Sequence, residues 1–299
     1  MSMSPNPVLK KLGLSNDDRV AIIHTDDIGM CQASVEAFAD LQEVGIISSG
    51  AVMVPCPWFL HAAQYARQHG QADLGVHLTL TSEWKTYRWG PISTRDPASG
   101  MMDDEGCFYQ RSELVQEHGD PAAVALELDA QVKRASAAGI VPTHVDTHMG
   151  SVAHPKFMNS YVQLAMQYHL PPMLFRLDEA GWRATGLDAE FAKIAAAFMQ
   201  QLEASGLPLL DALGGMPLDT DENRLERTKQ MLSDLQPGIT HFIIHPSKDT
   251  PEVRAITPDW RCRAADYQDF MNEELRQHIQ KIGLHVIGYR ALKELMPVA

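Results

Sequence analysis

Aspartate and histidine recur in this sequence at the ends of short apolar runs. The segments that carry them are residues 24–29 (HTDDIG), 75–79 (GVHLT), 144–148 (HVDTH) and 245–246 (HP). Each of these apolar runs is typical of a strand. In an α/β barrel the carboxyl ends of the strands meet at one end, where such enzymes keep their active sites. The four segments would therefore be brought together at that end of a barrel.

Each segment alone has an ordinary structural explanation. An aspartate after a strand commonly caps the next helix, and a histidine flanked by apolar residues, such as His77, is often a hydrogen-bonded core residue. The adjacent pair Asp26 and Asp27 is harder to explain as caps, because one helix end needs one cap and neighbouring carboxylates repel each other. We expect His144 and His148 to bracket a turn, with one of the two serving a structural purpose.

Together these side chains match the requirements of metal-assisted hydrolysis. Cleaving an amide or ester in this way needs a few fixed nitrogen and oxygen ligands and an open position for water. It also needs a base for that water and an acid for the leaving group. One carboxylate with two imidazoles suits Zn²⁺ or a similar first-row ion, whereas Mg²⁺ prefers more oxygen ligands. The pattern predicts one divalent metal ion, with Zn²⁺ favoured and Mg²⁺ as the alternative.

The elements that would position these side chains alternate along the chain. The expected strands are 20–24, 47–54, 74–80, 142–145, 173–176, 209–212, 241–245 and 285–288. The expected helices are 32–44, 58–69, 120–138, 188–205 and 266–282. This alternation predicts a single α/β domain with a (β/α) barrel-like fold of 7–8 mostly parallel strands. The alternative is an open doubly wound sheet, but the first strand leads into TDDIG and not into a GxGxxG turn.

Two segments interrupt the alternation. Residues 82–119 form a connection long enough to be an inserted lid or substrate loop, and residues 249–263 are expected to be irregular. Sugars present flat apolar faces on which aromatic rings stack. Trp84, Trp89 and Tyr109 in the long segment are therefore candidate substrate-binding residues.

Composition excludes several classes of protein. The 299 residues include 25 Lys+Arg and 38 Asp+Glu, a net charge of −13, which argues against nucleic acid or a membrane as partner. The 4 cysteines form no CxxC pair and are expected to be idle thiols. No signal-peptide core and no long apolar run are visible, so we expect a cytoplasmic protein. Residues 1–19 are expected to be an N-terminal extension to a domain over 20–299.

Taken in order, the motifs resemble those of the YdjC-like carbohydrate deacetylases, a family that includes the chitooligosaccharide deacetylases. The residues that carry the resemblance are 26–29, 75–81, 102–108 (MDDEGCF), 144–148, 245–246 and 288–290 (GYR). It extends from about residue 20 to 291, nearly the full chain. The resemblance implies a barrel-like fold and a metal-dependent hydrolase that removes an acetyl group from an N-acetylated sugar or a related small amide.

The resemblance also implies a role for each matching residue. Asp26 would be the general base and His245 the acid that protonates the leaving amine. The metal ligands would be Asp27, His77 and His148.

The expected partner is a small carbohydrate, and Arg290 of the closing motif joins the aromatic residues as a substrate-binding candidate. A homodimer is left open.

The chain departs from the family pattern around the expected metal site. His24-Thr25 stands where relatives usually have Asn-Ala, Ile28 replaces a common Phe, and Gly150 falls where many carry a further histidine. These changes leave the substrate open. Two alternatives are a different metallohydrolase on the same barrel, such as an esterase or phosphoesterase, and a non-catalytic carbohydrate-binding relative. The intact Asp26 argues against the latter, because binding alone needs no base.

Overall fold

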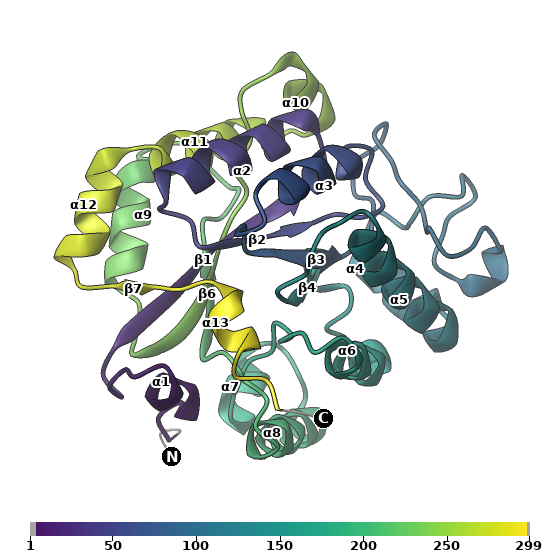
Figure 1. Ribbon diagram of the computed structural model, residues 1–299. Coiled ribbons are helices and arrows are strands. Elements are labelled where there is room, and N and C mark those ends of the chain that lie inside the picture. The colour runs from purple at the N-terminus through teal and green to yellow at the C-terminus, as the bar shows by residue number, and fades with distance from the viewer. Residues whose placement is uncertain (1–3, 298–299) are drawn as a thin grey trace.

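A parallel sheet forms the centre of the molecule (Figure 1). The computed structural model describes residues 4–297. The strands are β1 (Arg19–Ile28), β2 (Ser49–Val52), β3 (Leu74–Leu78), β4 (Val145–Thr147), β5 (Ala212–Gly215), β6 (Gly238–Ile244) and β7 (His285–Val286). Within the described residues they follow the order β4-β3-β2-β1-β6-β5, and β7 pairs with the beginning of β1. All of these pairings are parallel, as the strand–helix alternation predicts.

The segment after α6 (Pro155–Gln167) links the two edges of this sheet. It forms isolated parallel bridges between Val145 and Pro172 and between Phe175 and Leu210. The predicted strand 173–176 is therefore reduced to bridges, because the two preceding prolines have no N–H to donate to a ladder. The bridges carry the hydrogen bonding from β4 to the residues before β5. The prediction of a barrel-like α/β domain is confirmed.

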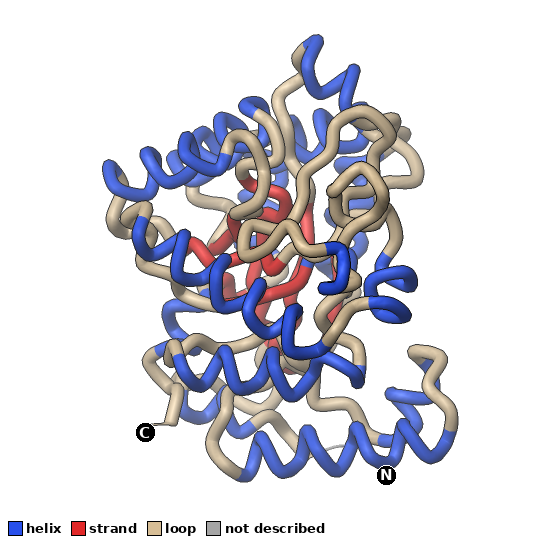
Figure 2. Tube along the Cα trace, turned by 90° about the vertical axis from the view of Figure 1, so that its right-hand side faces the viewer, coloured by secondary structure: helices blue, strands red, loops and turns tan. Residues whose placement is uncertain are grey.

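Helices surround the strands, as Figure 2 shows from a direction 90° away from Figure 1. They are α1 (Pro7–Lys11), α2 (Gln32–Val44), α3 (Phe59–Gln68), α4 (Ser112–His118), α5 (Pro121–Ala137), α6 (Pro155–Gln167), α7 (Glu179–Ala184), α8 (Ala189–Ala204), α9 (Arg224–Ser233), α10 (Pro251–Ile256), α11 (Trp260–Phe270), α12 (Glu273–Lys281) and α13 (Tyr289–Lys293). Two short 3₁₀ turns are η1 (Pro97–Ser99) and η2 (His148–Gly150). The Asp120 side chain caps α5 by accepting a hydrogen bond from the backbone of Ala123.

The C-terminal helical region differs from the prediction. The predicted single helix 266–282 is two helices, α11 and α12, because the side chain of Asn272 caps the second one. The segment 249–263, expected to be irregular, contains α10 and the beginning of α11. Thr250 caps α10, and Pro251 occupies its first position, where a missing N–H costs nothing.

The chain before β1 is also part of the packed structure. Val8 and Leu9 of α1 are buried against Tyr289 and Leu292 of α13. The side-chain nitrogen of Asn6 donates to the backbone oxygen of Leu209. The described part of the expected N-terminal extension thus covers one side of the barrel. Over residues 4–297, no helix is both long and apolar enough to cross a membrane.

The long segment 82–119 is anchored to the barrel and ends in α4. Trp84 and Trp89 are only 9% and 4% exposed. The buried carboxylate of Glu127 on α5 accepts hydrogen bonds from the backbone of Ile92, at 3.1 Å, and of Ser93, at 2.8 Å. A side chain of the outer helix therefore ties down the middle of this segment.

We expect Glu127→Leu to loosen the segment while the barrel stays folded. A hydrogen bond to a charged acceptor contributes about 1.5–3 kcal/mol, and water can reach the N–H of the exposed Ser93 when the carboxylate is gone, so the predicted loss in the free energy of unfolding is about 2–4 kcal/mol. Hydrogen exchange should rise at Ile92 and Ser93, and Glu127→Gln, which keeps an acceptor oxygen, should lose less. Leu126→Ala, at a position that is 65% exposed on the same helix, is the control. Unchanged exchange in Glu127→Leu would contradict the anchor.

Candidate metal centre and active site

A bulge at the end of β1 presents two neighbouring carboxylates. The strand continues beyond the predicted end at residue 24 and includes Asp26 and Asp27. Its pairing with β2 shifts register between Thr25 and Ile28, and Asp27 has a φ of 61°, in the left-handed region. Successive side chains of a regular strand point to opposite faces. A bulge with a positive φ re-aims a side chain, so both carboxylates can serve one site.

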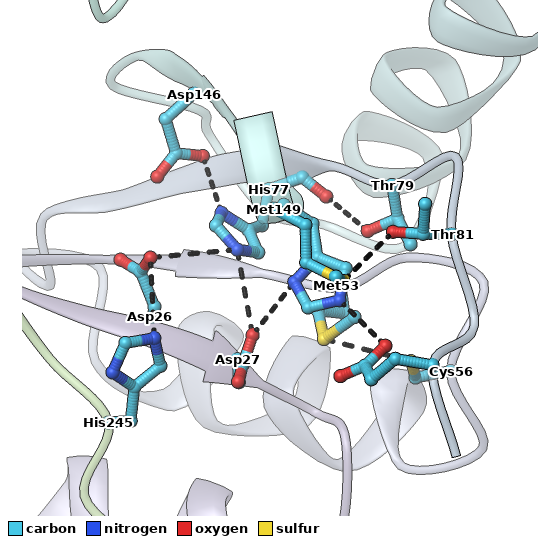
Figure 3. A network of polar contacts seen from close by, with 12 residues as sticks. Asp26, Asp27, Met53, Cys56, His77, Thr79, Thr81, Asp146, Met149 and His245 are labelled. Atoms are coloured by element: carbon cyan, nitrogen blue, oxygen red, sulfur yellow. Dashed lines mark hydrogen bonds and ion pairs between the residues drawn. The ribbon is translucent and has the colours of Figure 1, made fainter. Parts of the chain in front are cut away.

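Asp27, His77 and His148 form a compact donor set. Figure 3 shows Asp27 and His77 facing each other, with Asp26 and His245 beside them. One oxygen or nitrogen from each lies within 4.8 Å of the other two, and all three residues are buried. Asp27 Oδ1 is 3.1 Å from His148 Nδ1 and 3.6 Å from His77 Nε2. That buried oxygen accepts no hydrogen bond from any described residue. A free carboxylate oxygen facing two imidazole nitrogens fits a divalent metal ion.

A carboxylate contacts each of the two histidines at the ring nitrogen that does not face Asp27. His77 Nδ1 is 2.9 Å from Asp146 Oδ1, and His148 Nε2 is 3.0 Å from Glu83 Oε2. Such contacts fix the ring orientation of metal-ligating histidines. Burial favours the neutral form of His148, but Glu83 and Asp27 outweigh it and raise its pKa to about 9. Burial likewise opposes charge on His77, but Asp146 above all raises its pKa well above the usual value.

Arg263 of α11 occupies the other oxygen of Asp27. Its guanidinium lies 2.8 Å from Asp27 Oδ2 and 2.7 Å from Asp259 Oδ1. Burial alone would raise the pKa of Asp27, but Arg263 and then His148 hold that pKa well below its usual range. The arginine therefore keeps Asp27 ionised and leaves only Oδ1 for a metal ion.

Asp26 lies beside this donor set. Its Oδ2 is 3.7 Å from His77 Nε2 and 3.9 Å from His245 Nε2, whereas its Oδ1 lies 2.7 Å from His24 Nδ1. Burial would raise the pKa of Asp26, but His77 and His24 outweigh it and keep the carboxyl ionised. His245 is held by its backbone N–H, which donates to Asp266 Oδ2 at 2.9 Å. The arrangement can supply a base and an acid on adjacent sides of the donor set.

The substrate-binding candidates fall in different places. The ring of Trp89 is 6.4 Å from that of His148, and the ring of Trp84 is 5.8 Å from the Arg263 guanidinium. Tyr109 is half-buried and faces His118, at 5.7 Å between ring centroids. The two tryptophans thus line the donor set, mostly buried, and Tyr109 lies further along the segment.

Arg290 lies away from the site. Its side chain donates to the backbone oxygen of Ala72 at 3.1 Å, and its backbone N–H donates to Asp73 Oδ2. Asp73 directly precedes β3, whereas His77 is near the end of that strand, about 13 Å further along at the usual rise. The structure therefore does not bring Arg290 together with the other candidates.

The sequence reasoning gave no role to Glu83, Asp146 or Arg263. Asp146 belongs to the same short motif as His148, and its position between two histidines was an available signal. Glu83 opens the long segment, and Arg263 comes from α11, more than 200 residues after Asp27. No spacing in the sequence connects those two residues to the donor set; only the fold does.

Comparisons with known proteins agree with the motifs. The family model described as "YdjC-like protein" matches residues 20–281. A carbohydrate deacetylase from Thermus thermophilus is 32% identical over 289 residues, which cover 97% of this chain and 99% of the relative. A carbohydrate deacetylase from Thermoanaerobacter pseudethanolicus is 22% identical over 91% of this chain and 98% of the relative.

A solved structure supports the fold. A protein from Enterococcus faecalis, described as a candidate cellobiose-phosphate cleavage protein, matches with a TM-score of 0.72 at 20% identity. The match covers 92% of this chain and 99% of that one. Since the family model spans most of the chain and the ordered motifs resemble the same family, this chain belongs to the YdjC-like protein family.

Proposed function

We propose that this protein is a metal-dependent deacetylase that hydrolyses the amide of an N-acetylated sugar or a related small amide. The observation that carries the proposal is the buried set Asp27, His77 and His148 with Asp26 and His245 beside it. The relatives that bear the name carbohydrate deacetylase support the reaction class. One carboxylate with two imidazoles favours Zn²⁺ over Mg²⁺ as the resident ion.

Each residue has a part in the proposed reaction. Asp27, His77 and His148 would hold the ion, which when bound supplies Lewis-acid polarisation and a water of lowered pKa. Asp26 accepts a proton from the attacking water through Oδ2, because its Oδ1 is engaged by His24. His245 donates a proton to the departing amine. The products are acetate and a free amine.

The aromatic side chains suit a carbohydrate substrate. Trp84 and Trp89 pack edge to face at 5.4 Å between ring centroids, next to Arg263 and His148. A sugar ring can stack only on the small exposed part of Trp84, so the tryptophans also support the wall of the site. We propose that Trp84 and Tyr109 contact the substrate and that Trp89 mainly holds His148 in place.

A release assay on a substrate panel tests the reaction class. Zinc-loaded protein is incubated with N-acetylglucosamine oligomers, an acetate ester and a phosphorylated disaccharide. We expect acetate and free amine in equal amounts from the oligomers. Release from the ester alone would identify an esterase, and release of phosphate would identify a phosphoesterase. No product from any substrate with metal bound would identify a non-catalytic relative.

We expect His148→Ala to lose the bound ion. The variant removes one of three donors from a buried set, so metal content measured by mass spectrometry should fall from about one ion per chain to near zero. The control is His154→Ala, a partly exposed histidine that caps α6 and has no place in the set. Equal metal content in both variants would remove His148 from the ligand set.

We expect Asp26→Asn to keep the ion and lose the reaction. The amide preserves shape but is not a base, so kcat should fall by about 10²–10⁴-fold, the range for loss of general-base catalysis. Metal content measured on the same sample should remain that of the parent protein. Retention of activity would mean that Asp26 is structural and that another group takes the proton.

A further inference from the structure

A chain of buried polar side chains lies beneath Asp26. Asp26 Oδ1 is 2.7 Å from His24 Nδ1, and His24 Nε2 is 2.8 Å from His144 Nε2. His144 Nδ1 is 3.0 Å from Thr143 Oγ1, which donates to Asp73 Oδ1 at 2.5 Å. The chain runs from the candidate base at the end of β1 to the residue before β3. Apart from the contact of Asp26 with His24, these residues have no part in the proposed reaction.

Two glycines make room for this chain. A Cβ at Gly75 would lie 2.4 Å from the His144 ring, and a Cβ at Gly288 would lie 2.2 Å from Asp73 Oδ2. Neither glycine is needed for a positive φ, so it is their lack of a side chain that matters. The His144 ring stacks on Tyr289 at 3.8 Å between centroids and cannot move aside. The backbone is therefore built around these polar groups.

Asp73, at the far end of this series of side chains, determines where their hydrogens lie. Its carboxylate accepts from the hydroxyls of Ser49 and Thr143 and from the backbone N–H of Arg290. The single hydroxyl hydrogen of Thr143 is thereby used, so its oxygen can only accept from His144. The hydrogen between these two residues therefore belongs to His144 Nδ1.

The hydrogen bonds of His144 in turn determine the protonation state of His24. Burial above all keeps the pKa of His144 well below its usual value, so His144 is neutral and carries one hydrogen. Its Nε2 then has only a lone pair, and His24 Nε2 must donate the 2.8 Å bond. Since His24 Nδ1 donates to Asp26, both ring nitrogens of His24 are protonated.

The surroundings of His24 are consistent with a positive charge. Asp26 and Asp146 face it, the latter with an Oδ2 that is 3.6 Å from His24 Nε2 and accepts no hydrogen bond from any described residue. The remaining titratable groups against it are His144, His241 and Tyr289. Burial keeps the pKa of His241 low and that of Tyr289 high, so both are neutral. A buried cation between two carboxylates is compensated.

We propose that His24 is a buried imidazolium, held in that state by the Asp73–Thr143–His144 chain, and that it positions Asp26 for its role as base. The role of Asp26 rests on the proposed function, whereas the charge on His24 does not. Because His24 holds Oδ1, only Oδ2 of Asp26 faces His77 and His245. His24 is thus a positioning residue that touches neither the substrate nor the metal donors.

A second metal ion is the competing explanation for this cluster. His24, Asp26, Asp146 and His241 offer donor atoms within 4.8 Å of one another. An ion there would need a lone pair on His24, but both of its nitrogens are engaged in hydrogen bonds of 2.7 and 2.8 Å. With a proton on each ring nitrogen, His24 supplies in this cluster the positive charge that a second metal ion would otherwise supply.

The test uses zinc-loaded protein labelled with ¹⁵N-histidine, in which NMR reports the protonation of each ring nitrogen. The His24 signals are identified by their loss in His24→Asn. We expect two N–H groups on His24 in the parent protein and in Thr143→Ser, which keeps the hydroxyl. Thr143→Val keeps the shape but cannot accept from His144. His144 should then carry its hydrogen on Nε2, and His24 should retain only one.

Kinetic measurements on the same variants test whether His24 positions Asp26. Thr143→Val should lower kcat by about 10–100-fold, the usual effect of losing an outer-shell partner, with little change in KM, and Thr143→Ser should restore most of it. A single N–H on His24 in the parent protein overturns the proposal, as does a second bound ion that is lost in His24→Asn. The NMR result needs no substrate, so an inactive protein with a doubly protonated His24 would refute the proposed function and leave the charged state standing.

Discussion

Burial of several carboxylates at one end of the barrel is the constraint on which the site depends. Asp26, Asp27 and Asp146 are all less than 10% exposed. An ionised carboxylate left unpaired in such a place costs several kcal/mol, so each must meet a cation or a donor. Arg263 meets Asp27 at 2.8 Å, and histidines meet the other two. The fold therefore brings an arginine or a histidine against each of these three carboxylates.

This constraint explains which parts of the site the sequence could predict. Asp26 and Asp27 share one bulged strand end, and Asp146 and His148 share one motif, so their chemistry is visible in a few adjacent letters. The bulge itself depends on a φ of 61° at Asp27, which the residue type alone does not predict. Arg263 reaches Asp27 only because α11 packs against α2 beside β1, and contacts of that kind come from the assembled fold.

The same distinction holds for the fold. Helices with a local cap and a glycine stop, such as α2 before Gly45, were predicted to within one or two residues. The prediction of one helix over 266–282 was wrong, because Asn272 caps a new helix there. The apolar repeat in the sequence continues through this break and so does not reveal it. The length of 82–119 predicted an inserted lid or substrate loop, but it did not predict that Glu127 and the buried Trp89 anchor the segment to the barrel. The apolar periodicity of a sequence predicts which face of a helix or strand is apolar, but it does not predict which other element packs against that face.

The buried charges around the donor set also affect the binding of the proposed metal ion. Asp26, Asp27, Asp146 and Glu83 face the donor set. Among the described residues, the cations against them are Arg263, which also pairs with Asp259, and the proposed imidazolium of His24, so uncompensated negative charges remain that a bound divalent ion would offset. Without an ion, protons on His77 and His148 would balance them, and the raised pKa values of both rings reflect that. A bound metal ion would therefore compete with protons for the same nitrogens. A neutral His24 would leave a further negative charge buried in the site.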